Sequence, residues 1–268
     1  MAAITAKRVI KRLLPGVFRK AKSASRAVRF RFGHGGSEYR AKQALVKHYG
    51  KKVITGPFQE MRYGDNVACS AYVAKLVGSY EEELHAVIEQ IIQTPYKAVI
   101  DIGCAEGYYA VGIALHMTSA TVYAFDTDED AQRFCTDLAR LNRVQERVIV
   151  GGLCDHSTLE RLAGETTIII CDCEGFESEL LDPIRVPSLV ASDILVELHE
   201  FIQPGLTDML LRRFEGTHSI TLINTTERSP DAYAVLEHVP PSDRLAAVRE
   251  GRPASMQWAY MLHNKLTV

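Results

Sequence analysis

Residues 97–108 read KAVIDIGCAEGY, an apolar run that ends in a glycine-containing turn and the start of a helical pattern. This order is typical of a βα unit in an α/β sheet. Gly103 lets the backbone turn and approach a ligand closely, and Gly107 permits close packing of the following helix. The spacing D-x-G-x-x-x-G differs from the G-x-G-x-x-G of dinucleotide-binding proteins, because Ala105 occupies the place of the middle glycine.

Strand and helix patterns alternate along the chain beyond this unit. Apolar, β-rich runs end near Asp101, Asp126, Gly151, Asp172 and Glu197. Between and after them, helical patterns cover Tyr108–Met117, Glu129–Leu141, Ser157–Leu162, Ser178–Leu181 and Leu206–Phe214. Two late strands, His218–Asn224 and Gln257–His263, are joined by a polar segment without a long helical pattern. The sequence therefore predicts a Rossmann-like, doubly wound α/β fold with a mostly parallel sheet and a C-terminal antiparallel β-hairpin.

The region before the first strand is expected to be helical. Ser79–Gln93 reads SYEEELHAVIEQIIQ, which predicts one helix with Ser79 as its N-cap and three glutamates in the first turn. We divide the chain into a basic helical extension over residues 1–52, a helical lead-in over 53–95 and the main domain over 96–268.

The N-terminal extension differs sharply in charge from the rest. Residues 1–52 hold 15 of the 31 Lys and Arg residues but only one of the 33 acidic residues. Apolar and basic side chains alternate at helical spacing from residue 7 to residue 17, and a second helix is expected from about residue 38 to 49. Residues 1–32 could pack on the acidic body, contact an anionic membrane surface or act as a transit peptide or nucleic-acid arm. We do not expect the acidic body to bind nucleic acid unaided.

Composition excludes several other classes of protein. There is no run of 18 or more apolar residues, so we expect no transmembrane helix. Basic residues interrupt the apolar N-terminus, which argues against a secretory signal peptide. The six cysteines are scattered through a long chain and suggest reduced thiols. These features predict a cytoplasmic protein, which the basic extension could bring to a membrane surface.

Polar side chains follow the predicted strands, at the edge of a parallel sheet where ligands bind. Asp126 ends the second strand, where an acid can accept both hydrogen bonds from a ribose diol. Asp155 follows the third strand and could reach an adenine amine or cap the next helix. Asp172 and Glu174 follow the fourth strand, and Glu197 and His199 lie at the end of the fifth. If these two strands are neighbours, their acids and the histidine form one cluster.

These segments resemble a class I S-adenosylmethionine-dependent methyltransferase. More narrowly, ICDCEGFE at residues 170–177 and ILVELHE at 194–200 resemble the FkbM-type family, whose motifs are roughly D-x-E-G-x-E and I-x-x-E-I-H. The resemblance covers about residues 79–200. It implies a seven-stranded sheet and methyl transfer to a hydroxyl of a sugar, lipid or small natural product. The cofactor site that it implies comprises Asp101, Gly103, Cys104, Glu106, Gly107, Tyr108, Asp126, Thr127, Asp155 and Asp172.

The hypothesis for catalysis rests on His199, Glu197 and Glu174. His199 is the preferred base for the acceptor hydroxyl, because histidine titrates near neutral pH, and Glu197 would orient it. A divalent cation held by Asp172 and Glu174, with or without Glu197, is the competing scheme, which we do not favour. Two other classes stay open: an NAD(P)-dependent oxidoreductase and a non-catalytic nucleotide-binding module.

Overall fold

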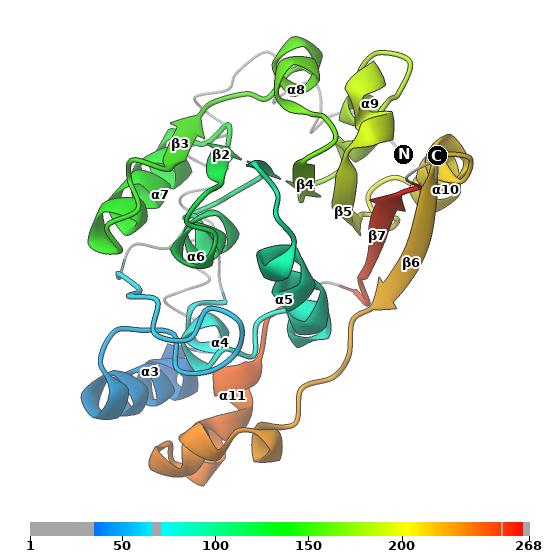
Figure 1. The fold of residues 1–268 in the computed structure, drawn as a ribbon. Helices are drawn as coiled ribbons and strands as arrows, with labels where there is room; N and C mark the ends of the chain where they lie inside the picture. The colour runs from blue at the N-terminus through cyan, green and yellow to red at the C-terminus, as the bar shows by residue number, and fades with distance from the viewer. Residues whose placement is uncertain (1–34, 66–70, 253, 265–268) are drawn as a thin grey trace, which may run out of the picture.

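A computed structural model of the chain describes residues 35–65, 71–252 and 254–264. One sheet of seven strands has the order β3-β2-β1-β4-β5-β7-β6 (Figure 1). Its strands are β1 Ala98–Ile102, β2 Thr121–Phe125, β3 Val148–Gly151, β4 Thr167–Cys171, β5 Asp193–Leu198, β6 His218–Asn224 and β7 Gln257–His263. Strands β1 to β5 are parallel, and β7 runs antiparallel to both β5 and β6. The expected doubly wound sheet with its late antiparallel pair is confirmed.

Helices cover both faces of the sheet. The α-helices are α3 Gly35–Tyr49, α4 Tyr72–Val77, α5 His85–Gln93, α6 Tyr108–His116, α7 Glu129–Leu141, α8 His156–Leu162, α9 Glu177–Leu180, α10 Leu206–Phe214 and α11 Arg244–Val248. Side chains of α4 to α7 share one apolar core with one face of the sheet. Side chains of α8, α9 and α10 share a second core with the other face. We call the two faces the α6 face and the α10 face.

The strand β4 shows how the sequence sorts its side chains. Ile168 and Ile170 belong to the core on the α6 face, whereas Ile169 and Cys171 belong to the core on the α10 face. All four are buried, which explains the continuous apolar run. Because neighbouring residues of a strand point to opposite faces, the position of a residue in its strand determines which face its side chain occupies.

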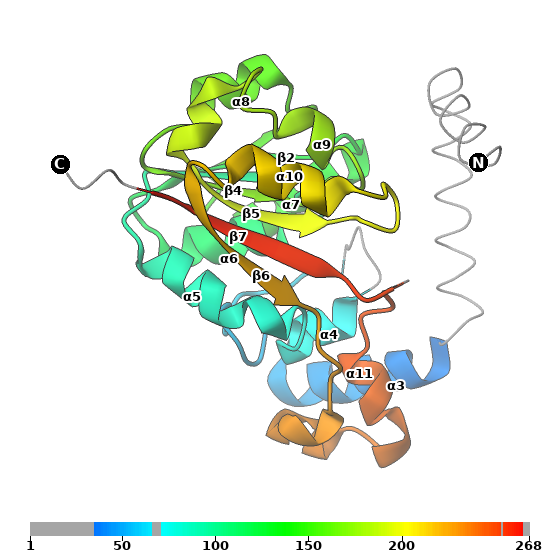
Figure 2. The same cartoon turned by 90° about the vertical axis from the view of Figure 1, so that its right-hand side faces the viewer.

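Residues 35–52 pack against the connection between β6 and β7. The helix α3 contacts α11 and α4 (Figure 2), and the guanidinium of Arg40 binds the buried carboxylate of Asp243 at 2.7 Å. The connection itself, residues 225–256, contains the 3-10 helices η3 Pro230–Ala232, η4 Ala234–His238 and η5 Pro241–Asp243 besides α11. Residues 1–34, which include the predicted amphipathic basic segment, lie outside the described residues.

Within the described ranges, no helix combines the length and the apolar character that crossing a bilayer requires.

The predicted helix from Ser79 to Gln93 is wrong in its first third. The observed elements are a 3-10 turn, η1 Glu82–Leu84, followed by α5 from His85. Glu81 has a left-handed backbone with φ 49°, which a continuous α-helix excludes. Ser79 is buried and does not cap; its hydroxyl donates to the carbonyl of Ala74. Buried contacts of Glu81 with distant residues therefore override the local helical pattern.

Candidate active site

Three adjacent strands bring their polar ends to the α6 face of the sheet. Asp101 in β1 is two residues after Val99, whose side chain lies in the core on that face. Cys171 pairs with Val196 across β4 and β5, so the residues that follow each, Asp172 and Glu197, lie side by side. The fourth and fifth strands are neighbours, which is the condition for the predicted cluster, and their acidic ends meet.

His199 is held from one side by Glu177. The ring nitrogen Nδ1 of His199 lies 2.8 Å from Oε1 of Glu177, which begins α9. Glu177 is fully buried, and its Oε1 also accepts a hydrogen bond from the backbone N–H of Cys173 at 3.1 Å. A carboxylate at Nδ1 fixes the ring and favours the tautomer whose Nε2 lone pair is available.

The other ring nitrogen of His199 faces two more carboxylates. Nε2 lies 3.3 Å from Oε2 of Glu197 and 3.5 Å from Oδ1 of Asp172. Burial, together with the charges of Asp172 and Glu81, raises the pKa of Glu197 to about 10. The surroundings of Glu197 therefore disfavour its anion, and the charge of Arg252 opposes this effect.

The titration of His199 reflects two opposing influences. Burial alone would lower the pKa of this imidazole, but the hydrogen bond and the charge of Glu177 outweigh burial and raise it. Asp172 also has a raised pKa, chiefly because burial disfavours its anion. The sequence hypothesis gave Glu197 the role of orienting the ring. In the structure Glu177 holds Nδ1 instead, and Glu197 lies beside Nε2.

The turn after β1 packs tightly against the end of β4. A Cβ atom on Gly103 would lie 1.7 Å from the carbonyl oxygen of Asp172, and the φ of Gly103 is 88°. A Cβ atom on Gly107 would lie 2.6 Å from Sγ of Cys135 in α7. Both glycines are therefore required by sterics, and Ala105 between them takes a left-handed φ of 50°. The turn and Asp172 form one rigid edge.

Three side chains predicted for the cofactor site face the interior of the protein. Glu106 is 1% exposed, and its carboxylate binds the ammonium of Lys75 and the hydroxyl of Tyr63. Burial opposes its ionisation, but the charge of Lys75 outweighs it, and the pKa of Glu106 falls to about 2. Cys104 and Tyr108 are buried as well. Glu106 anchors the turn to Lys75, and any cofactor contact by these residues would come from their backbones.

Asp101 and Asp126 flank the turn. Oδ2 of Asp101 is buried and has no hydrogen-bond partner within the described part of the chain, and burial together with the charge of Asp172 raises the pKa of Asp101 to about 7. Asp126, at the end of β2, accepts hydrogen bonds from the backbone N–H groups of Ala105 at 3.0 Å and Asp128 at 2.8 Å. Thr127 is exposed beside it. Asp126 lies where the ribose contact is predicted and also ties β2 to the turn.

Asp155 caps α8. Its Oδ1 accepts from the backbone N–H of Thr158 at 2.8 Å and from the hydroxyl of Ser157 at 2.9 Å. These hydrogen bonds, above all that from Thr158, lower the pKa of Asp155. The cap, one of the two roles open to this residue, is present; the adenine contact stays a prediction.

Glu177 was missed by the sequence hypothesis, which instead selected Glu174. Glu174 is exposed and has a left-handed φ of 57° in the loop after β4. Ligand atoms of Asp172, Glu177 and His199 lie within 4.8 Å of one another, which would suit a cation. The last acid of the D-x-E-G-x-E motif is Glu177, and that motif was the signal that could have identified it.

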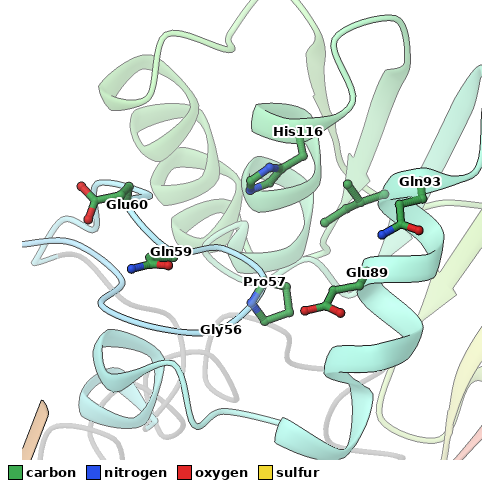
Figure 3. Close-up of a pocket in the computed structure, with 8 residues that line it drawn as sticks. Gly56, Pro57, Gln59, Glu60, Glu89, Gln93 and His116 are labelled. Atoms are coloured by element: carbon green, nitrogen blue, oxygen red, sulfur yellow. The ribbon is translucent and has the colours of Figure 1, made fainter. Parts of the chain in front are cut away.

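Two surface pockets lie at the opposite edge of the sheet. One, of about 360 Å³, is lined by the turn at Gly56–Glu60, by Glu89 and Gln93 of α5 and by His116 (Figure 3). His116 ends α6, whose first residue follows the glycine turn. The other, of about 460 Å³, includes Leu141 at the end of α7. Neither pocket is lined by residues of the candidate site.

Comparison with known families gives one match. The model of the family described as "Ribosomal protein L11 methyltransferase (PrmA)" matches residues 84–173, about a third of the chain. The matched segment contains the glycine turn, Asp126, Asp155 and Asp172, and it ends before Glu177, Glu197 and His199. No curated protein sequence matches the chain.

Several solved structures are similar to the chain. A Klebsiella pneumoniae protein described as an O-methyltransferase is 12% identical, with 96% of this chain and 95% of that chain covered and a TM-score of 0.46. An O-methyltransferase from Bacillus cereus in complex with SAH is 11% identical, covers 66% and 79%, and has a TM-score of 0.45. P. horikoshii TYW2 in complex with MeSAdo is 12% identical, with a TM-score of 0.40. The alignment covers 66% of this chain and 60% of the TYW2 chain. Similarity at this level carries no conclusion about activity.

Proposed function

We propose that this chain is an S-adenosylmethionine-dependent methyltransferase that methylates a hydroxyl group, with His199 as the general base. The observation that carries the proposal is the Glu177–His199 pair at the end of β5, next to Asp172 and the glycine turn. A carboxylate that holds Nδ1 leaves Nε2 to accept a proton from an acceptor hydroxyl. The match of residues 84–173 to a methyltransferase family supports the cofactor half of the proposal.

The residues of the chain suit a cofactor with a positive charge. Asp101, Asp172 and Glu197 lie at adjacent strand ends, and Oδ2 of Asp101 is buried without a partner among the described residues. When bound, S-adenosylmethionine supplies a methyl group on a positively charged sulfur. The acids would favour that charge, Asp126 would accept from the ribose, and the glycine turn would hold the methionine side. His199 would then take the proton of a hydroxyl aligned with that methyl group.

The acceptor is expected to carry both hydroxyls and an apolar face. Phe201 is half exposed, and its ring centre lies 6.0 Å from that of His199. Phe176 and Ile202 are also exposed, and a Cβ atom on Gly175 would lie 2.8 Å from Ile202, so the loops after β4 and β5 touch. Carboxylates that accept from hydroxyls beside apolar side chains suit a sugar, a lipid or a small natural product.

Calorimetry with S-adenosylmethionine and transfer of a tritiated methyl group to a panel of glycans, lipids and phenols would test the proposal. We expect binding by the wild type and by His199→Gln, with transfer reduced roughly 10²- to 10⁴-fold in the variant. Failure of the wild type to bind S-adenosylmethionine overturns the proposal. Tritium transfer from a labelled nicotinamide cofactor would indicate an oxidoreductase, and cofactor binding without any transfer would indicate a binding module.

The ligand set expected from the sequence is not the one that the structure groups; a metal scheme with a different set, Asp172, Glu177 and His199, has that grouping in its favour. However, Glu177 contacts Nδ1 and Asp172 lies at Nε2, on the other side of the ring. This arrangement suits a histidine between two carboxylates better than one ion shared by all three. Full activity after treatment with a chelator would support the base, and activity restored only by added Mg²⁺ or Mn²⁺ would support the metal.

A further inference from the structure

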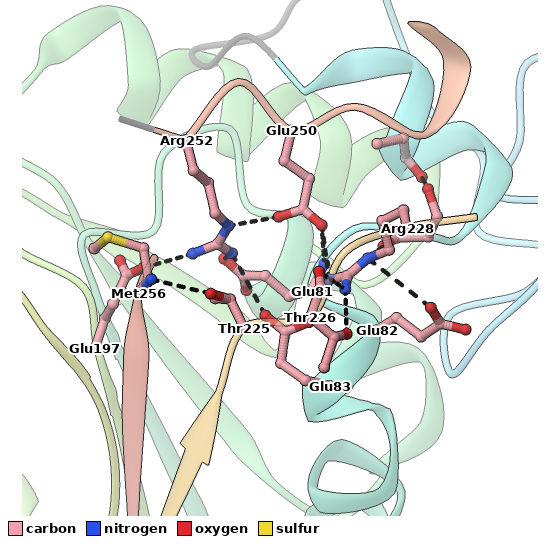
Figure 4. Close-up of polar contacts among 12 residues, drawn as sticks. Glu81, Glu82, Glu83, Glu197, Thr225, Thr226, Arg228, Glu250, Arg252 and Met256 are labelled. Atoms are coloured by element: carbon pink, nitrogen blue, oxygen red, sulfur yellow. Dashed lines mark hydrogen bonds and ion pairs between the residues drawn. The ribbon is translucent and has the colours of Figure 1, made fainter. Parts of the chain in front are cut away.

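A cluster of buried charges lies next to the candidate active site, on the α6 face of the sheet. It joins Glu81 and Glu83, which precede α5, to Arg228, Glu250 and Arg252 of the β6–β7 connection (Figure 4). The cluster reaches β5 at Glu197, which binds Arg252. These residues come from three segments that are far apart in the sequence.

Arg252 contacts a different carboxylate with each guanidinium nitrogen. Nη1 lies 2.9 Å from Oε1 of Glu197, Nη2 lies 2.8 Å from Oε1 of Glu81, and Nε lies 2.7 Å from Oε2 of Glu250. Figure 4 shows the guanidinium between Glu197 on one side and Glu250 on the other. Three contacts leave the planar group little freedom, and those with Glu197 and Glu81 tie the β6–β7 connection to β5 and to the segment before α5.

The contact with Glu197 has a direct consequence for the active site. Arg252 binds Oε1 of Glu197, and the other oxygen, Oε2, lies 3.3 Å from Nε2 of His199. One carboxylate therefore separates the guanidinium from the proposed base. Without Arg252, the Glu197 side chain would lose the contact that determines which oxygen faces the histidine.

We propose that Arg252 is a positioning residue of the active site, which holds Glu197 so that its second oxygen is presented to His199. The inference rests on the proposed function, in which His199 is the base. It also gives the β6–β7 connection, which lies outside the matched family segment, a part in the chemistry.

His199 is surrounded by charged groups from several elements. Asp172 and Glu174 follow β4, Glu177 begins α9, and Glu197 belongs to β5. All are acids, and in the described part of the chain the cation Arg252 reaches them through Glu197. Loss of this positive charge should therefore increase the proton affinity of His199.

NMR titration of the histidine rings in the full chain tests this directly, with His199→Gln used to assign the signal. In Arg252→Gln we expect the titration midpoint of the His199 ring to rise by roughly one pH unit, because the positive charge that is lost lies next to Glu197, which contacts the ring. At a pH well below the wild-type midpoint, turnover should fall about tenfold with S-adenosylmethionine affinity unchanged, since one unit there corresponds to a tenfold smaller fraction of neutral base. Arg252→Lys retains the charge and should show less than half of the shift.

Arg228→Gln is the matched control. Arg228 belongs to the same cluster and is more buried, 6% against 18% for the Arg252 side chain. Its contacts are with Glu82, Glu83, Glu250, Ser79 and Thr226. General damage to the cluster would therefore appear at least as strongly in this variant, whereas we expect less than half of the His199 shift and nearly normal turnover.

The inference is overturned if Arg252→Gln titrates and turns over as Arg228→Gln does. If either glutamine variant fails to fold, Arg252→Lys is compared with Arg228→Lys. Turnover should fall further in Arg252→Lys, because the single nitrogen of a lysine side chain cannot hold Glu197, Glu81 and Glu250 together. Absence of methyl transfer by the wild type would refute the proposed function, while the NMR titration would still decide whether Arg252 controls His199. Normal wild-type transfer with an unaffected Arg252→Gln would refute this inference alone.

Discussion

Oε1 of Glu177 lies 2.8 Å from Nδ1 of His199, in an environment where Glu177 is fully buried. In Glu177→Gln the amide can still accept from Cys173 but no longer stabilises a protonated imidazole. We expect turnover to fall roughly 10²- to 10⁴-fold while cofactor affinity changes little. Glu179→Gln, at an exposed acid of the same helix, is the control for steady-state kinetics. Equal activity of the two variants would contradict the assignment of Glu177.

The raised pKa of His199 predicts the pH dependence of the reaction. A general base acts in its unprotonated form, and the pKa of this imidazole lies above its ordinary value of 6.5. We therefore expect kcat/KM for the acceptor to rise with pH through a midpoint above 6.5 and then to level off. In Glu177→Gln the midpoint should move to lower pH, because the main contact that raises the pKa is lost. A profile that is flat between pH 6 and 9 would argue against His199 as base.

The strand ends of the site were accessible from the sequence because β-structure sorts side chains by position. The apolar runs placed Asp101, Asp172 and Glu197 at strand ends, and their alternation with buried residues places all three on one face. The amphipathic helix α7 also has the bounds expected from its pattern. Local pattern was sufficient here, because burial of one face determines both the element and its orientation.

The sequence hypothesis failed where distant contacts decide the local structure. The left-handed Glu81 interrupts a strong helical pattern, and its carboxylate binds Tyr109 of α6 and Arg252, 171 residues away. Glu106 carries a charge suited to a ligand, yet it faces the buried Lys75. Neither pairing has a local signature, because each depends on how elements pack in three dimensions. Glu174 and Thr127 lie in loops after β4 and β2, and their exposure depends on the path of those loops, which no periodic pattern predicts.

Gly103 and Gly50 provide a comparison of two left-handed glycines. At Gly103 (φ 88°) a Cβ atom would lie 1.7 Å from the carbonyl oxygen of Asp172, whereas at Gly50 (φ 79°) it would meet no described atom within 4 Å. Gly50→Ala should lower the free energy of unfolding by about 1 kcal/mol, from backbone strain alone. Gly103→Ala should lower it by more than about 3 kcal/mol and abolish cofactor binding, because the turn must move away from β4. Equal losses in urea denaturation would show that the turn adapts without cost.

The Lys75–Glu106 pair predicts how stability depends on pH. The pKa of Glu106 is about 2 in the folded chain, below its ordinary value of 4.5, so its contribution is complete above pH 4.5 and is lost as the pH falls towards 2. That difference corresponds to about 3 kcal/mol. We expect the stability advantage of the wild type over Glu106→Gln to shrink between pH 5 and 3 in urea denaturation. Glu165→Gln, at an exposed acid, serves as control, and a constant advantage would refute the prediction.

The two roles open to Asp155 can be separated by a residue that caps a helix but carries no charge. Asp155→Ala should lower the free energy of unfolding, because Thr158 and Ser157 lose their acceptor, whereas Asp155→Ser should retain most of the stability that the cap provides. If the second oxygen of Asp155 accepts from the adenine amine, Asp155→Ser should bind S-adenosylmethionine about tenfold more weakly, the effect of one hydrogen bond. Asp128→Ser, at the N-cap of α7, controls for the loss of a nearby negative charge. If calorimetry shows that Asp155→Ser binds S-adenosylmethionine as tightly as the wild type does, Asp155 acts only as a helix cap. The adenine contact would then be made by another residue of the loop after β3.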